Sequence, residues 1–140
     1  TFVNDSKGTT IESTVVALNS FDKKVILICG GKDKKLDWKL LSKEISKKVK
    51  AVFLIGELTE ILRWELINEK FNPNLIYRCF NLERAVEEFK QFLDFEIEYI
   101  VLLSPATSSY DQFSSFEERG NIFKKLVLEN FGDTIEKNKI

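Results

Sequence analysis

The sequence contains no histidine, and this absence excludes several classes of active site. Ser-His-Asp and Cys-His nucleophilic sites, histidine-bound metals and acid-base catalysis by imidazole all need that residue. Any chemistry must therefore rest on Lys, Asp, Glu, Ser or Thr. We expect no metal ion to be bound by these residues alone.

Cysteine, proline and glycine are also scarce. Cys29 and Cys79 each lie at the end of an apolar run, where cysteine usually serves as a small buried hydrophobic residue, so no disulfide is expected. Two prolines and six glycines in 140 residues, with 44% hydrophobic and 31% charged residues, argue against disordered or low-complexity chains. The composition indicates one compact soluble domain over residues 1–140.

The charges nearly balance, since 21 Lys and Arg stand against 22 Asp and Glu. Nucleic-acid binding finds no support, because no overall field would hold a polyanion. No apolar stretch reaches the roughly 18 residues that span a bilayer, and the first residues show no signal-peptide pattern. We therefore expect a cytoplasmic protein with neither nucleic acid nor membrane as a partner.

Four short apolar runs are typical of buried parallel strands. They are Val25–Cys29, Ala51–Ile55, Leu75–Phe80 and Tyr99–Leu103. Segments with helical spacing lie between them, and further helices are predicted at about 10–18 and 116–131. Phe2 and Val3 could add an edge strand, whereas the polar residues 133–140 are expected to fray. This alternation predicts a Rossmann-like α/β domain of three layers, with a mostly parallel sheet flanked by helices.

Ligands of such sheets bind outside the carboxyl ends of the strands, where three polar loops are predicted. Residues 4–10 offer a carboxylate, an ammonium group and hydroxyls before a helix whose N-terminus favours an anion, although Thr9 or Thr10 could simply cap that helix. Residues 30–35 resemble a phosphate loop but match neither G-x-x-x-x-G-K-[ST] nor G-x-G-x-x-G, and could form only a tight turn with solvated lysines. Residues 104–113 carry five hydroxyls, which suit a carboxylate or phosphate ligand.

Taken together, the three loops resemble the C-terminal domain of the Mur ligase family, and the resemblance spans nearly the whole chain. The motifs that carry it are Asn4-Asp5-Ser6-Lys7 with Thr9, Gly30-Gly31 with Lys34 and Asp37, and Leu103-Ser104-Pro105-Ala106 followed by Ser109, Asp111-Gln112-Phe113, Phe116-Glu117 and Arg119-Gly120. The last block is the most specific, and it favours the branch of the family that adds D-glutamate.

The resemblance implies an ATP-dependent, amide-forming ligase of peptidoglycan precursor synthesis in the bacterial cytoplasm. Such a ligase joins D-glutamate to UDP-N-acetylmuramoyl-L-alanine through an acyl phosphate, and Mg²⁺ assists the phosphoryl transfer. The central P-loop domain that holds ATP and the N-terminal domain that holds the UDP sugar are not found in these 140 residues. We therefore expect a fragment of a three-domain enzyme that is inactive alone.

The resemblance also implies roles for individual residues. Asp5 would contact the nucleotide ribose, and Lys7 would act in catalysis beside the phosphate and the incoming amino acid. The residues implied to surround D-glutamate are Thr9, Lys34, Ser109 and Phe116. Three neighbouring lysines, Lys32, Lys34 and Lys35, leave the register of the active one open, and Lys34 is preferred.

Two other interpretations remain open at this point. A stand-alone Rossmann-like module could use the same loops to bind a nucleotide or an acidic metabolite. A purely structural interaction domain would give no reason for three polar loops at one edge of the sheet. Because methionine is absent even from position 1, the ligase fragment is favoured.

Overall fold

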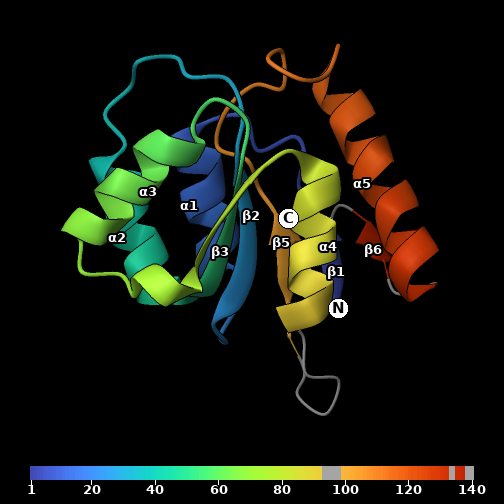
Figure 1. The fold of residues 1–140 in the computed structure, drawn as a ribbon, viewed down its shortest axis with the longest axis horizontal. Helices are drawn as coiled ribbons and strands as arrows, with labels where there is room; N and C mark the ends of the chain where they lie inside the picture. Colours follow the sequence, from blue (N-terminus) through green and yellow to red (C-terminus); the bar gives the residue numbers. More distant parts are fainter. Residues whose placement is uncertain (93–98, 133–134, 138–140) are drawn as a thin grey trace.

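The computed structural model describes residues 1–92, 99–132 and 135–137, and it shows a parallel sheet with helices on both faces (Figure 1). The strands lie in the order β4-β3-β2-β5-β1-β6, and every pairing between them is parallel. Their bounds are β1 Phe2–Asn4, β2 Val25–Gly30, β3 Val49–Ile55, β4 Ile76–Phe80, β5 Val101–Leu103 and β6 Ile135–Lys137. The predicted Rossmann-like architecture is confirmed.

Helices α1 to α3 cover one face of the sheet, and α4 and α5 cover the other (Figure 1). Their bounds are α1 Ile11–Asn19, α2 Lys39–Lys48, α3 Thr59–Asn68, α4 Leu82–Phe92 and α5 Phe116–Phe131. Leu75, predicted to begin a strand, instead ends the short 3₁₀ helix η1, Pro73–Leu75, which is opened by a proline. No helix in the described part of the chain is long and apolar enough to cross a bilayer.

Alternate residues of the central strands enter two separate cores. Leu27 and Cys29 of β2 pack with the layer of α1 to α3, whereas Ile26 and Ile28 pack with the layer of α4 and α5. This division follows from the two-residue period of a strand, and it explains why the strand is apolar throughout. Cys29 and Cys79 are free and buried, and burial raises the pKa of each thiol to about 12.

Two expectations about the ends of the sheet are wrong. Strand β1 is not at an edge, because it lies between β5 and β6. Within the polar segment 133–140, Ile135–Lys137 forms β6, with Ile135 opposite Phe2, so this part does not fray. The physical reason is that β1 has backbone N–H and C=O groups along both of its edges. A short strand can pair with the edge that β5 leaves free, whatever side chains that strand carries. Residues 133–134 and 138–140 lie outside the described residues.

Candidate functional site

The three predicted loops meet at the carboxyl edge of the sheet. They follow β1, β2 and β5, which are neighbours in the order β2-β5-β1. Backbone hydrogen bonds join them, from Ala106 N to Gly8 O at 2.8 Å and from Lys32 N to Ser108 O at 3.0 Å. The loop after β5 therefore lies between the other two, and Asp5, Lys7, Lys34 and Ser109 belong to loops at one edge.

Arg119 of α5 makes hydrogen bonds to two of these loops, those that follow β1 and β5. Its side chain is 1% exposed and donates to Ser6 Oγ at 2.9 Å, Ser6 O at 2.8 Å and Thr107 O at 3.1 Å. Burial lowers the pKa of Arg119 to about 10, which still leaves the guanidinium charged at pH 7. Sequence reasoning used Arg119 only as part of a motif, because nothing in the sequence shows that its side chain turns inward.

Asp5 lies next to this cation and is itself 8% exposed. Ser104 Oγ donates to Asp5 Oδ2 at 2.8 Å, and Thr14 Oγ1 lies 2.9 Å from Ser104 Oγ. Burial raises the pKa of Asp5, while the Ser104 hydrogen bond and the charges of Arg119 and Lys7 act in the opposite direction. A Cβ at Gly8 would lie 2.7 Å from both Asp5 Oδ2 and Ser104 Oγ, so glycine leaves room for this contact.

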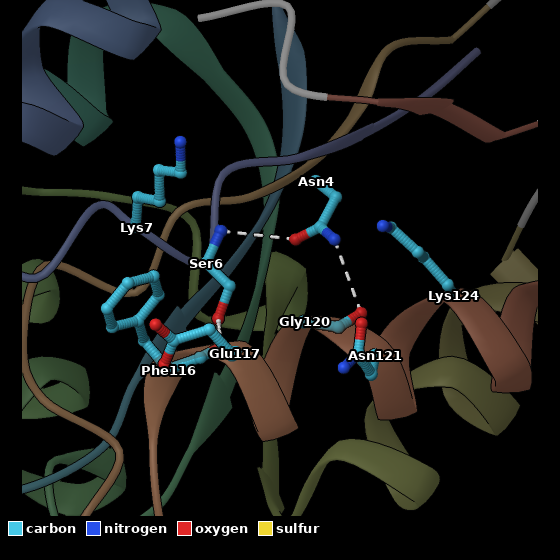
Figure 2. Close-up of a pocket in the computed structure, with 8 residues that line it drawn as sticks. All are labelled: Asn4, Ser6, Lys7, Phe116, Glu117, Gly120, Asn121 and Lys124. Atoms are coloured by element: carbon cyan, nitrogen blue, oxygen red, sulfur yellow. Dashed lines mark hydrogen bonds between the residues drawn. The ribbon is translucent and has the colours of Figure 1, made fainter.

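Lys7 lines two cavities, one toward α1 and one toward α5. The first, of about 380 Å³, is lined by Asp5, Lys7, Gly8, Glu12, Ser13 and Val16. The second, of about 200 Å³, is lined by Asn4, Ser6, Lys7, Phe116, Glu117, Gly120, Asn121 and Lys124 (Figure 2). Lys7 is thus the residue that a ligand in either cavity would meet.

The wall of the smaller cavity is fixed by hydrogen bonds between β1 and α5. Asn4 accepts from Ser6 N at 3.1 Å and donates to Gly120 O at 3.2 Å, and Ser6 Oγ donates to Phe116 O at 2.7 Å. In Figure 2, Lys7 and Lys124 lie on opposite sides of Asn4. The Ser6 hydroxyl donates within this wall, so the side-chain donors left for an anion are Lys7, Lys124, Asn121 and the second N–H of Asn4.

The three lysines after β2 differ in their partners. Lys32 Nζ lies 3.6 Å from Glu57 Oε1, and Lys35 Nζ lies 3.0 Å from Asp33 Oδ2. Lys34 is exposed and, among the residues that the structure describes, has no acidic partner. Glu57 was not predicted from sequence, yet it also accepts from Asp33 N at 3.1 Å and so helps to hold the loop.

The other residues predicted to surround D-glutamate differ in whether they share a cavity with Lys7. Phe116 does, but Thr9, Lys34 and Ser109 do not line the smaller cavity. Ser109 is 2% exposed, and its Oγ is the one buried side-chain oxygen or nitrogen without a hydrogen-bond partner in the described part of the chain. Thr10, not Thr9, caps α1, by accepting from Ser13 N at 3.1 Å.

The site also offers little to a metal ion. No group of three or more His, Cys, Asp or Glu residues within ranges 1–92, 99–132 and 135–137 could hold one. The Mg²⁺ that the resemblance implies for the whole enzyme is therefore not assigned to residues of this chain. Asp5 and Lys7 are suited instead to a hydroxyl and to an anionic group.

Comparison with known proteins agrees with this combination of fold and loops, and places the chain in the Mur ligase family. Within it, the chain is similar to UDP-N-acetylmuramoylalanine–D-glutamate ligases. It is 43% identical to that of Fusobacterium nucleatum over 131 residues, 43% to that of Natranaerobius thermophilus over 133, and 36% to that of Prochlorococcus marinus over 134. No protein-family profile matches the chain.

These similarities cover most of the chain but only part of each relative. They include 94%, 94% and 91% of the chain, against 30%, 28% and 27% of the three ligases. The chain thus spans less than a third of the length of the relatives it matches.

Proposed function

We propose that this chain is the C-terminal domain of an ATP-dependent ligase that adds D-glutamate to UDP-N-acetylmuramoyl-L-alanine in bacterial peptidoglycan precursor synthesis. The observation that carries this proposal is the position of Lys7 between two cavities, in a chain related to D-glutamate ligases. A reaction that joins a phosphorylated substrate to an amino acid needs a cation where the two meet. The proposed setting is the bacterial cytoplasm.

The two cavities then receive different ligands. The cavity with Asp5 takes the ribose of ATP, whose hydroxyl can donate to the Asp5 carboxylate. The cavity with Phe116 takes the incoming D-glutamate. The ammonium group of Lys7 stabilises the negative charge of the acyl phosphate as the amine attacks it.

Thr9, Lys34 and Ser109 complete the D-glutamate site in this proposal. A dicarboxylate needs donors from several directions, and these residues provide two hydroxyls and one ammonium group. The unpartnered Ser109 Oγ supports a ligand role, since buried polar atoms in proteins nearly always have a partner. Because these residues do not line the cavity of Phe116, we infer that the rest of the ligase completes the D-glutamate site when this domain closes against it.

The free charge of Lys34 gives the first test. In a ligase assembled from residues 1–140 and the remaining domains of the Fusobacterium nucleatum relative, Lys34→Ala should raise the KM for D-glutamate about 10- to 150-fold, the effect of one charge-assisted hydrogen bond. The KM for ATP should change little. Lys35→Ala is the matched control, because Lys35 is already paired with Asp33.

Steady-state kinetics with one substrate varied at a time provide the measurement. Asp5→Ala should show the opposite preference and raise the KM for ATP first. Equal effects of Lys34→Ala on both substrates, or a larger effect of Lys35→Ala on D-glutamate, would contradict the assignment of Lys34.

A further inference from the structure

Asp5 is held by two buried hydroxyls that come from distant parts of the chain. Ser104, directly after β5, donates to Asp5 Oδ2 at 2.8 Å, and Thr14 of α1 lies 2.9 Å from the Ser104 hydroxyl. Both hydroxyl residues are fully buried. The three side chains therefore form a continuous row from the inner face of α1 to the cavity lined by Asp5 and Lys7.

The direction of the hydrogen bonds in this row follows from a count of protons. A serine hydroxyl has one proton, and that of Ser104 is given to Asp5. Thr14 is then the donor toward Ser104, and its one proton is shared between Ser104 Oγ at 2.9 Å and Ser104 O at 3.2 Å. Thr14 thus orients Ser104, and Ser104 orients the carboxylate of Asp5.

The other carboxylate oxygen is left for a ligand. Within the described ranges no donor is bonded to Asp5 Oδ1, while Asp5 lines the larger cavity. We propose that Ser104 and Thr14 are positioning residues that fix the Asp5 carboxylate with one oxygen bound inside the protein and the other presented to the nucleotide. This inference rests on the nucleotide role proposed for Asp5.

The charged groups around Asp5 come from three elements. Arg119 approaches from α5, Lys7 belongs to the same loop as Asp5, and Glu12 of α1 lines the same cavity. Removing the Ser104 hydroxyl leaves the buried carboxylate with these charges but without its neutral donor. The pKa of Asp5 then rises further, because the Ser104 hydrogen bond favours the charged form.

The first experiment measures the Asp5 carboxyl directly, by carbon NMR titration of the 140-residue chain. Ser104→Ala should raise the pKa of Asp5, and Thr14→Val should raise it less, whereas Thr14→Ser retains the hydroxyl and should leave it near the value of the unmodified chain. Gly8→Ala is an independent variant, since its methyl group would force Asp5 Oδ2 and Ser104 Oγ apart without deleting either. It should raise the pKa as well.

The second experiment measures ATP use in the assembled ligase. Ser104→Ala should raise the KM for ATP about 10-fold, with a smaller effect on the KM for D-glutamate, and should move the acidic limb of the pH profile for ATP to higher pH. Thr14→Val should also raise the KM for ATP, whereas Thr14→Ser should leave it near the value of the unmodified ligase. Ser42→Ala is the matched control, because it removes a buried hydroxyl of α2 that donates to O of the N-cap residue Trp38.

The outcomes separate the two proposals. If Asp5→Ala leaves the KM for ATP unchanged, or the assembled ligase has no activity, the proposed function fails. If Asp5→Ala raises that KM and Ser104→Ala does not, the positioning role is overturned. An Asp5 pKa that is the same with and without the Ser104 hydroxyl overturns it also, whatever the kinetics show.

Discussion

Asp5 lies in buried surroundings that disfavour the charged form of its carboxyl group. Burial is the largest influence on its pKa and raises it from 3.8, against the opposing effects of Ser104, Arg119 and Lys7. The folded chain therefore binds the Asp5 proton more tightly than the unfolded chain. A carboxylate kept charged at such a site lowers the stability of the folded chain.

The stability of Asp5→Asn should reveal this effect. Below pH 3.8 the proton is bound in both states and the effect is absent; as pH rises through the folded pKa of Asp5, the original chain loses stability. Asp5→Asn should thus become more stable than the original chain as pH increases from 3 to 7. Urea unfolding at several pH values measures it, and a difference that is constant or that declines with pH would contradict it.

At the residue scale, the positions of some site residues could be predicted from the sequence and those of others could not. Asp5 and Lys7 lie in a short polar loop between a strand and a helix, so their position at the sheet edge could be predicted locally. Ser104 and Arg119 act on residues 99 and 113 positions away in the sequence, and such contacts depend on the assembled sheet. Their direction, inward rather than toward solvent, has no local signal.

Helix α5 is the element that holds the site together. Ser115 caps it by accepting from Glu118 N at 3.1 Å, and Arg119 one turn further on reaches both neighbouring loops. The helix therefore fixes the loops after β1 and β5 at the same time. A substitution of Arg119 should therefore disturb both loops.

Arg119→Lys tests this. Lysine keeps the charge but cannot reproduce the planar set of donors, so at least one buried acceptor is left unpaired. We expect a loss of about 2 to 3 kcal/mol in the free energy of unfolding. Urea denaturation measures it, with the exposed Arg84→Lys as a control expected to stay within about 0.5 kcal/mol. Equal effects of both variants would show that Arg119 does not hold the loops.

Most elements were predictable because their apolar residues follow a helix or strand period. Strand β2 and residues 51–55 of β3 are apolar runs, and α5 was predicted with the bounds that the structure shows. Strand β6 was not predictable, since three residues of mixed character carry no period. Its existence depends on the free edge of β1, which is a property of the sheet and not of residues 135–137.

At the scale of the whole molecule, the site is incomplete. The donors proposed for D-glutamate do not line one cavity, and the sequence contains no P-loop motif. The 140-residue chain should therefore release no phosphate from ATP in the presence of Mg²⁺, D-glutamate and UDP-N-acetylmuramoyl-L-alanine. A phosphate-release assay measures this, with the assembled ligase as the positive control. Turnover above background would mean that the complete nucleotide site, including the phosphate-binding part, lies within this domain.

The place of β1 between β5 and β6 determines the order in which the domain can fold. Phe2 is paired with Val101 and with Ile135, so β1 has its partners about 100 or more residues later in the chain. Strands β2, β3 and β4 can pair much earlier, whereas the loop that carries Asp5 and Lys7 takes its position only when β5 exists. A nascent chain that stops before β5 can thus form three of the six strands as a sheet but cannot assemble the proposed site, which couples ligand recognition to the synthesis of β5.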